Sequence, residues 1–158
     1  MPLTMIAGPS YLPAGYEFSH RAEGARAGGL GSDPSQVGLF YRRGAALEDL
    51  RIPLAVYIGP PSAPDLVATD GRQGAEVDLG VRRTIAKYHD GLWMLGQGED
   101  EFDAGPVLLH WDRSTLHSVT VRWPGGTVAV RGPKARGVDY NELLKVARSL
   151  FPLEAGGT

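Results

Sequence analysis

Apolar residues alternate with polar ones in two neighbouring segments near the end of the chain. These apolar positions are Val119, Val121, Trp123, Val128 and Val130. A period of two is typical of strands that bury one face, and Gly125-Gly126 between the segments suits a two-residue hairpin turn. The hairpin predicted on this turn places Trp123 opposite Val128. Arg122 and Arg131 then lie together on its polar face.

The same alternation continues upstream, at Val107, Leu109 and Trp111. A five-residue loop at 112–116 keeps the apolar faces consistent, because it pairs Leu109 with Val119. We therefore predict a three-stranded antiparallel meander over 107–131. It has one apolar side, which needs a covering layer.

A helix predicted at about 140–151 can supply that layer. Asp139 is a suitable N-cap residue, and Glu142 three positions later is typical of a capping box. An apolar stripe at helical spacing follows, made of Tyr140, Leu143, Leu144, Ala147, Leu150 and Phe151. Pro152 ends the helix. We expect the leucines to pack on the valine face of the meander.

Further short strands are predicted from residue composition and turn signals. They lie at 16–18, 37–42, 52–58, 75–79, 82–89 and 92–95. Asp90-Gly91 suits a tight hairpin turn that sets Tyr88 opposite Trp93. Leu12-Pro13-Ala14-Gly15 is typical of a type I turn, and Gly59-Pro60-Pro61 ends a strand. The Gly- and Ala-rich segment at 22–35 is predicted to be a mobile surface loop.

Composition agrees with this pattern. The 158 residues include 22 Gly and 12 Pro, which interrupt helices and favour short strands. A chain of this length suits one domain, taken as 1–158. The predicted fold is α+β: a curved, mostly antiparallel sheet of about 7–9 short strands packed by one C-terminal helix.

Net charge and cysteine content exclude several classes of function. A formal charge of −2 provides no general attraction to nucleic acid, and the lack of cysteine excludes thiolate chemistry and disulfides. No apolar run approaches the roughly 20 residues of a membrane span. A complete chain is thus expected to be cytoplasmic, and an excised domain extracytoplasmic. No cofactor is predicted.

Candidate catalytic and metal-binding groups do not converge in the predicted fold. The residue types needed for a metal site are present at His110, His117 and Asp112. However, the expected register puts the two histidines on opposite faces of the sheet. They are therefore interpreted as strand-edge histidines that pair with local groups. A Ser118–His117–Asp112 triad fails because neighbouring strand residues point apart. Phosphate-binding loop motifs are missing. Four aromatic side chains could stack a ligand, but they also fit a core: Tyr88, Trp93, Trp111 and Trp123.

Two charged segments are candidates for a partner surface. The basic residues are Arg122, Arg131, Lys134 and Arg136, and the acidic ones are Glu99, Asp100, Glu101 and Asp103. Without a partner, the basic residues are explained as a solvated face of the sheet and the acidic residues as a solvated turn. Alternatively, the basic surface of one copy binds the acidic loop of another, and such a homo-oligomer would dissociate at high salt.

Three stretches together resemble a known family. They are Tyr11-Leu-Pro-Ala-Gly-Tyr-Glu-Phe18, His89-Asp-Gly-Leu-Trp93, and the end of the chain, with Ser118-Val-Thr-Val-Arg-Trp123 and Glu142-Leu-Leu-Lys-Val-Ala-Arg-Ser-Leu150. The order resembles a bacterial family of unknown function, found as the extracytoplasmic C-terminal part of anti-sigma-factor-like membrane proteins. The family's usual N-terminal anchor is not matched here. The resemblance implies a sensing or binding module and no catalytic residues.

These observations favour a non-catalytic binding or sensing module whose partner is an unknown protein or small ligand. The alternative is a structural subunit that assembles with itself or with a larger complex. A hydrolytic enzyme ranks third.

Overall fold

The computed structural model describes residues 8–23, 36–44, 52–63, 66–67, 69, 71–95, 101–103 and 108–151. Most of the predicted loop at 22–35 lies outside these residues, as do Glu99, Asp100, Val107 and Pro152.

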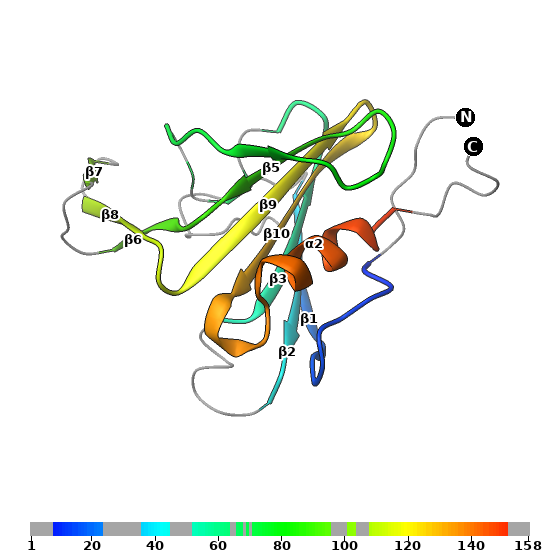
Figure 1. Ribbon diagram of the computed structural model, residues 1–158, viewed down its shortest axis with the longest axis horizontal. Helices are drawn as coiled ribbons and strands as arrows, with labels where there is room; N and C mark the ends of the chain where they lie inside the picture. The colour runs from blue at the N-terminus through cyan, green and yellow to red at the C-terminus, as the bar shows by residue number, and fades with distance from the viewer. Residues whose placement is uncertain are drawn as a thin grey trace.

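The described residues contain ten strands and one α-helix (Figure 1). The strands are β1 Glu17–Glu23, β2 Val37–Arg42, β3 Leu54–Gly59, β4 Ala75–Val77, β5 Ile85–His89, β6 Leu92–Leu95, β7 Glu101–Asp103, β8 Leu108–Asp112, β9 Leu116–Trp123 and β10 Gly126–Pro133. A short 3-10 turn, η1 Lys134–Arg136, precedes the helix, α2 Tyr140–Arg148.

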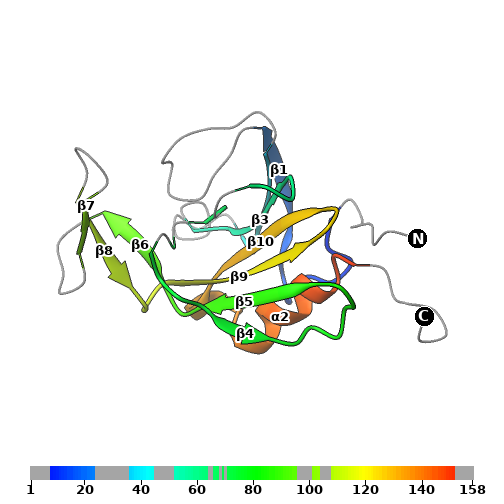
Figure 2. The same cartoon turned by 90° about the horizontal axis from the view of Figure 1, so that it is seen from above.

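The strands form two antiparallel sheets. The larger has seven strands in the order β1-β2-β3-β10-β9-β5-β4, and the smaller has the order β6-β8-β7. Figure 2 shows α2 on one side of the large sheet, and the small sheet at the opposite end from the termini. The α+β prediction is confirmed. No helix among the described residues has the length and hydropathy to cross a bilayer.

The β9–β10 hairpin has the predicted faces but a different register. Val128 lies opposite Val121 instead of Trp123, so the pairing is displaced by two residues. The turn is Pro124-Gly125, since proline fixes the φ angle that a turn's second position needs. Gly126 instead pairs with Trp123, where an added Cβ would lie 3.0 Å from the indole ring.

The predicted helix is confirmed, but it ends at Arg148 and not near residue 151. Leu143, Ala147 and Leu150 pack on the sheet as predicted. Of the other predicted stripe residues, Tyr140 is 42% exposed and Leu144 is half-buried, and Val146, which was not predicted, is buried.

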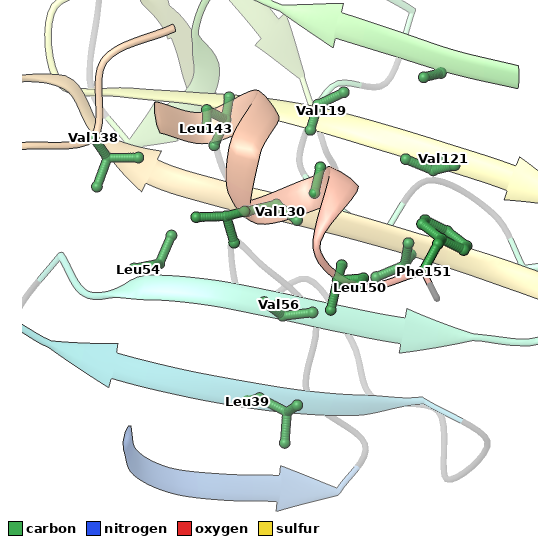
Figure 3. Close-up of a cluster of buried hydrophobic side chains, with 14 of the residues drawn as sticks. Leu39, Leu54, Val56, Val119, Val121, Val130, Val138, Leu143, Leu150 and Phe151 are labelled. Atoms are coloured by element: carbon green, nitrogen blue, oxygen red, sulfur yellow. The ribbon is translucent and has the colours of Figure 1, made fainter. Parts of the chain in front are cut away.

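Asp139 caps α2 by accepting a hydrogen bond from the Glu142 N–H at 2.8 Å. Glu142 does not complete a capping box, because its carboxylate accepts a hydrogen bond from the Tyr11 hydroxyl. The main core lies between the helix and the sheet, and Figure 3 shows part of it, including Leu143, Leu150, Val119, Val121 and Val130. Val146, Ala147 and Val128 belong to the same core.

The predicted three-stranded meander is wrong in its first strand. β8 pairs with β6 and β7 in the small sheet, and the two neighbours of β9 are β10 and β5. Leu109 therefore lies opposite Leu95 and Phe102, and Val119 opposite Tyr88 and Val130. The alternating pattern of β8 is compatible with either sheet, so the sequence did not indicate that β8 belongs to the small sheet.

The predicted hairpin within 82–95 is also wrong. β5 is hydrogen-bonded on both sides, to β4 and β9, which leaves no edge for β6. Gly91 turns the chain out of the large sheet: its φ is +130°, and an added Cβ would lie 2.6 Å from the Asp112 carbonyl oxygen. β5 begins only at Ile85 because Arg83 has a left-handed φ of +61°.

The predicted type I turn near the start is displaced by one residue. The Tyr16 N–H donates to the Pro13 carbonyl at 3.1 Å, so Pro13 is the first residue of the turn. Gly15 is the third, with φ of +84°, a value that favours glycine there and is typical of a type II turn.

The second face of the large sheet carries a smaller core. Its buried residues are Ala55, Tyr57, Ala63, Leu66, Val67, Leu92, Leu116 and Ala129. They lie on β3 and β10, on the segment after β3, and at the neighbouring ends of β6 and β9.

Candidate functional site

A pocket of about 440 Å³ opens on the second face, over β5 and β9. The described residues that line it are Arg72, Gln73, Gly74, Ile85, Lys87, His89, Thr120 and Arg122. This volume lies within the usual range for sites that bind small molecules.

Strand alternation determines which side chains reach the pocket. On β5, Ala86 packs in the helix-side core, so Ile85, Lys87 and His89 lie on the second face. β9 contributes Thr120, directly opposite Lys87, and Arg122, directly opposite Ile85. The floor of the pocket is therefore a two-stranded antiparallel ladder.

The segment 72–74 forms the opposing wall. The backbone carbonyl of Arg72 lies 3.2 Å from His89 Nε2, which fixes this nitrogen as the proton donor. The Arg72 guanidinium stacks over the rings of Trp111 and Trp93, at 4.3 and 5.6 Å from their centroids. An added Cβ at Gly74 would lie 2.7 Å from the His89 ring, so glycine permits the close approach of this wall.

Cationic groups surround the pocket. Arg122 Nη1 donates to the carbonyl of Ala63 at 2.8 Å and to Thr127 Oγ1 at 3.2 Å, so this guanidinium is held in place. Lys87 is exposed, and among the described residues no carboxylate lies within ion-pair distance of its ammonium. None of the described lining residues is acidic. The arrangement can therefore hold an anion.

A second pocket of about 330 Å³ adjoins the first at Arg72, Gln73 and His89. Its other described lining residues are Ala75, Tyr88, Asp90, Trp111 and Arg113. It includes a carboxylate, so it is less suited to an anion than the first.

The predicted basic surface is not one solvated patch. Arg122 and Arg131 do share the second face, but Arg122 belongs to the pocket and Arg131 stacks 5.8 Å from the Tyr57 ring centroid. Lys134 donates to Asp90 and to the carbonyl of Arg113. Arg136 is half-buried, and its carbonyl accepts the Tyr16 hydroxyl at 2.7 Å.

The predicted acidic loop is described only in part. Glu101 and Asp103 belong to β7, where they pair with His110 and Leu108 of β8. Glu99 and Asp100 lie outside the described residues. β7 is in the small sheet, whereas Arg122 and Arg131 are in the large sheet.

The candidate metal and triad residues are separated. His117 is 1% exposed in the large sheet, where its Nε2 donates to the Val138 carbonyl at 2.7 Å and its Nδ1 accepts from the Tyr88 hydroxyl at 2.8 Å. It is a core residue and not a strand-edge histidine. His110 and Asp112 lie on β8 in the small sheet, and Asp112 accepts from Ser114. In the described part of the chain, no three potential ligands converge on a metal position.

Sequence reasoning missed most of this pocket. Of its lining residues, only Arg122 was a candidate for binding. The signal available for β5 was Ile85, Lys87 and His89 at a spacing of two, which predicts a shared face. No periodicity marks 72–74 as the opposing wall.

Comparison of the chain with protein-family models, with curated protein sequences and with solved structures finds no significant match.

Proposed function

We propose that the protein is a non-catalytic binding module that holds a small anionic ligand in the pocket over β5 and β9. The observation that carries this proposal is the pocket itself: about 440 Å³, with three cationic side chains and no carboxylate among its described lining. A charge-assisted hydrogen bond to an anion is about twice as strong as a neutral one.

The fixed positions of two cations support a binding role. Arg72 is held by its stack on Trp111, and Arg122 by hydrogen bonds to a carbonyl and a hydroxyl. Side chains that are already ordered lose less conformational entropy when a ligand binds. The two held arginines therefore keep positive charge in the pocket lining at little entropic cost.

The chemistry of the lining favours binding over catalysis. General acid–base catalysis needs groups positioned to give and to take a proton, most often imidazoles and carboxylates. The described lining offers one imidazole, that of His89, whose Nε2 is already engaged with a backbone carbonyl. Sensing as the biological role of this binding rests on the sequence resemblance.

The proposal is tested by titrating the ¹⁵N-labelled protein with acetate and with sulfate while recording amide spectra. We expect the shifts to concentrate at 72–74, 85–89 and 120–122. Lys87→Gln should weaken binding by roughly tenfold, because a charge-assisted contact is lost. Lys145→Gln is the matched control: it removes the same charge from α2, on the opposite side of the sheet, and should leave the affinity unchanged. Shifts confined to other regions would refute the proposal.

A further inference from the structure

An apolar side chain is exposed in the floor of this cationic pocket. Ile85 is 58% exposed although it lies within a strand. The edge strand β4 pairs only with Ala86–Tyr88 of β5, so Ile85 lies just beyond its end. A bound ligand could remove this apolar surface from water.

Ile85 and Lys87 are spaced for one ligand to contact both. They lie on the same face of β5, two residues apart, which corresponds to about 7 Å along an extended strand. The pocket is also larger than a bare oxyanion requires, since volumes above roughly 300 Å³ are typical of sites for small organic molecules.

Among the described residues, the charged groups on the neighbouring strands do not pair with Lys87. Glu76 lies opposite Lys87 on β4, but it is exposed and makes no ion pair with the ammonium. Arg122, opposite Ile85, already donates to the Ala63 carbonyl. The ammonium of Lys87 is therefore the group best placed to bind a ligand's charge.

We propose that the ligand is a small organic anion with a short apolar chain, whose carboxylate or phosphate head lies at Lys87 and whose chain packs on Ile85. The inference rests on the proposed function, because it assigns the ligand class of the same pocket. The two observations behind it are the exposed isoleucine and the cationic lining.

Calorimetric titration of the unmodified protein tests the ligand class directly. The probes are acetate, butanoate, hexanoate and 1-hexanol, and their binding site is mapped by amide shifts. Each methylene that becomes buried should strengthen binding up to about fourfold. 1-Hexanol should bind roughly tenfold more weakly than hexanoate, because it lacks the charge. Tighter binding of hexyl phosphate than of hexanoate would identify phosphate as the head group within the same class.

Two variants separate the contributions of chain and charge. Ile85→Ser should abolish the gain from acetate to hexanoate and keep the affinity for acetate. Lys87→Gln should reduce the affinity for both anions and keep the ratio between them. Phe18→Ser is the matched control, since Phe18 is also 58% exposed but lies on β1 at the other edge of the sheet. It should change neither quantity.

Three outcomes would overturn the inference. One is equal affinity of acetate and hexanoate at the pocket, which would leave the proposed function intact. Another is equal affinity of hexanoate and 1-hexanol. The third is the absence of binding at 72–74 and 85–89 by any of the anions, which would remove the proposed function as well.

Discussion

The two faces of the large sheet differ although the same strands form them. On the side of α2, β9 presents Val119 and Val121, both 0% exposed within the main apolar core. On the other side the same strand presents Thr120 and Arg122 to the pocket. One strand thus contributes to the main core through one face and lines the proposed binding pocket through the other. Substitutions on the two faces should have separable effects.

The largest expected effect is on the helix side. Leu143→Ala removes a fully buried side chain between α2 and the sheet and should lower the free energy of unfolding by about 2–5 kcal/mol; Leu150→Ala should do the same. Urea denaturation measures the loss. Ile85→Thr, on the pocket face, is the contrasting variant and should change stability by about 0.5 kcal/mol or less. Equal losses would show that the faces do not divide as described.

A buried polar group on the helix side should have the next largest effect. His117→Leu leaves the Val138 carbonyl and the Tyr88 hydroxyl without this partner, which should cost about 1–3 kcal/mol in unfolding free energy. His20→Gln, at an exposed histidine, is the control and should be neutral within about 0.5 kcal/mol.

The same histidine makes stability depend on pH. Burial lowers the pKa of His117 below its ordinary 6.5, and Lys134 lowers it further, while the Val138 carbonyl, Asp90 and Asp139 oppose the shift. The unfolded chain therefore takes up a proton that the folded chain does not, once the pH falls below about 6.5. Stability should fall from there down to the folded-state pKa, by at most about 1.4 kcal/mol per pH unit for this group. Melting curves between pH 8 and 5 should lose this dependence in His117→Leu and keep it in His20→Gln.

A smaller effect is expected at the start of α2. Asp139→Ala removes the N-cap acceptor and should destabilise the protein by about 1 kcal/mol. Asp139→Asn retains a side-chain oxygen and should preserve most of the stability. Thermal denaturation of both variants checks this, and an equal loss in both would point to charge instead of capping.

The smallest effect should come from the pocket's lysine. Lys87 is exposed and makes no ion pair with a described residue, so Lys87→Gln should leave the unfolding free energy within about 0.5 kcal/mol of the original. Its effect should appear only in anion binding. A large loss of stability would mean that this face also holds the fold together.

The helix-side face could be predicted because its signals are local. The alternation of Val119 and Val121 gave the buried face of β9, and the N-cap at Asp139 gave the start of α2. The same alternation gave correct faces even though the register of the hairpin was displaced by two residues, since a shift of two keeps every side chain on its side. An alternating pattern therefore determines which side chains share a face of the sheet, but not which residues are paired across the strands.

The small sheet and the pocket could not be predicted, because their determinants are non-local. Trp111 alternates as Trp123 does, and the pattern contains nothing that assigns them to different sheets. Asp90-Gly91 is compatible with a tight turn, but the hydrogen bonds of β9 and β4 occupy both edges of β5. The pocket depends on Arg72 and its stack on Trp111, a contact between residues far apart in sequence.

The corner at Gly91 has a consequence for how this chain can vary. The chain leaves the large sheet after His89 and re-enters it at Leu116, and the two ends of the segment between them meet. Trp111 Nε1 donates to the Asp90 carbonyl, and Leu92 pairs with Asp112. A segment whose two ends lie together can be lengthened, shortened or exchanged with little disturbance to its host. The small sheet is therefore an insertion between two strands that are already paired. A replacement that kept Leu92, which is buried in the second core, and Trp111, on which Arg72 stacks, could alter this end of the molecule while α2 and its core stayed as they are.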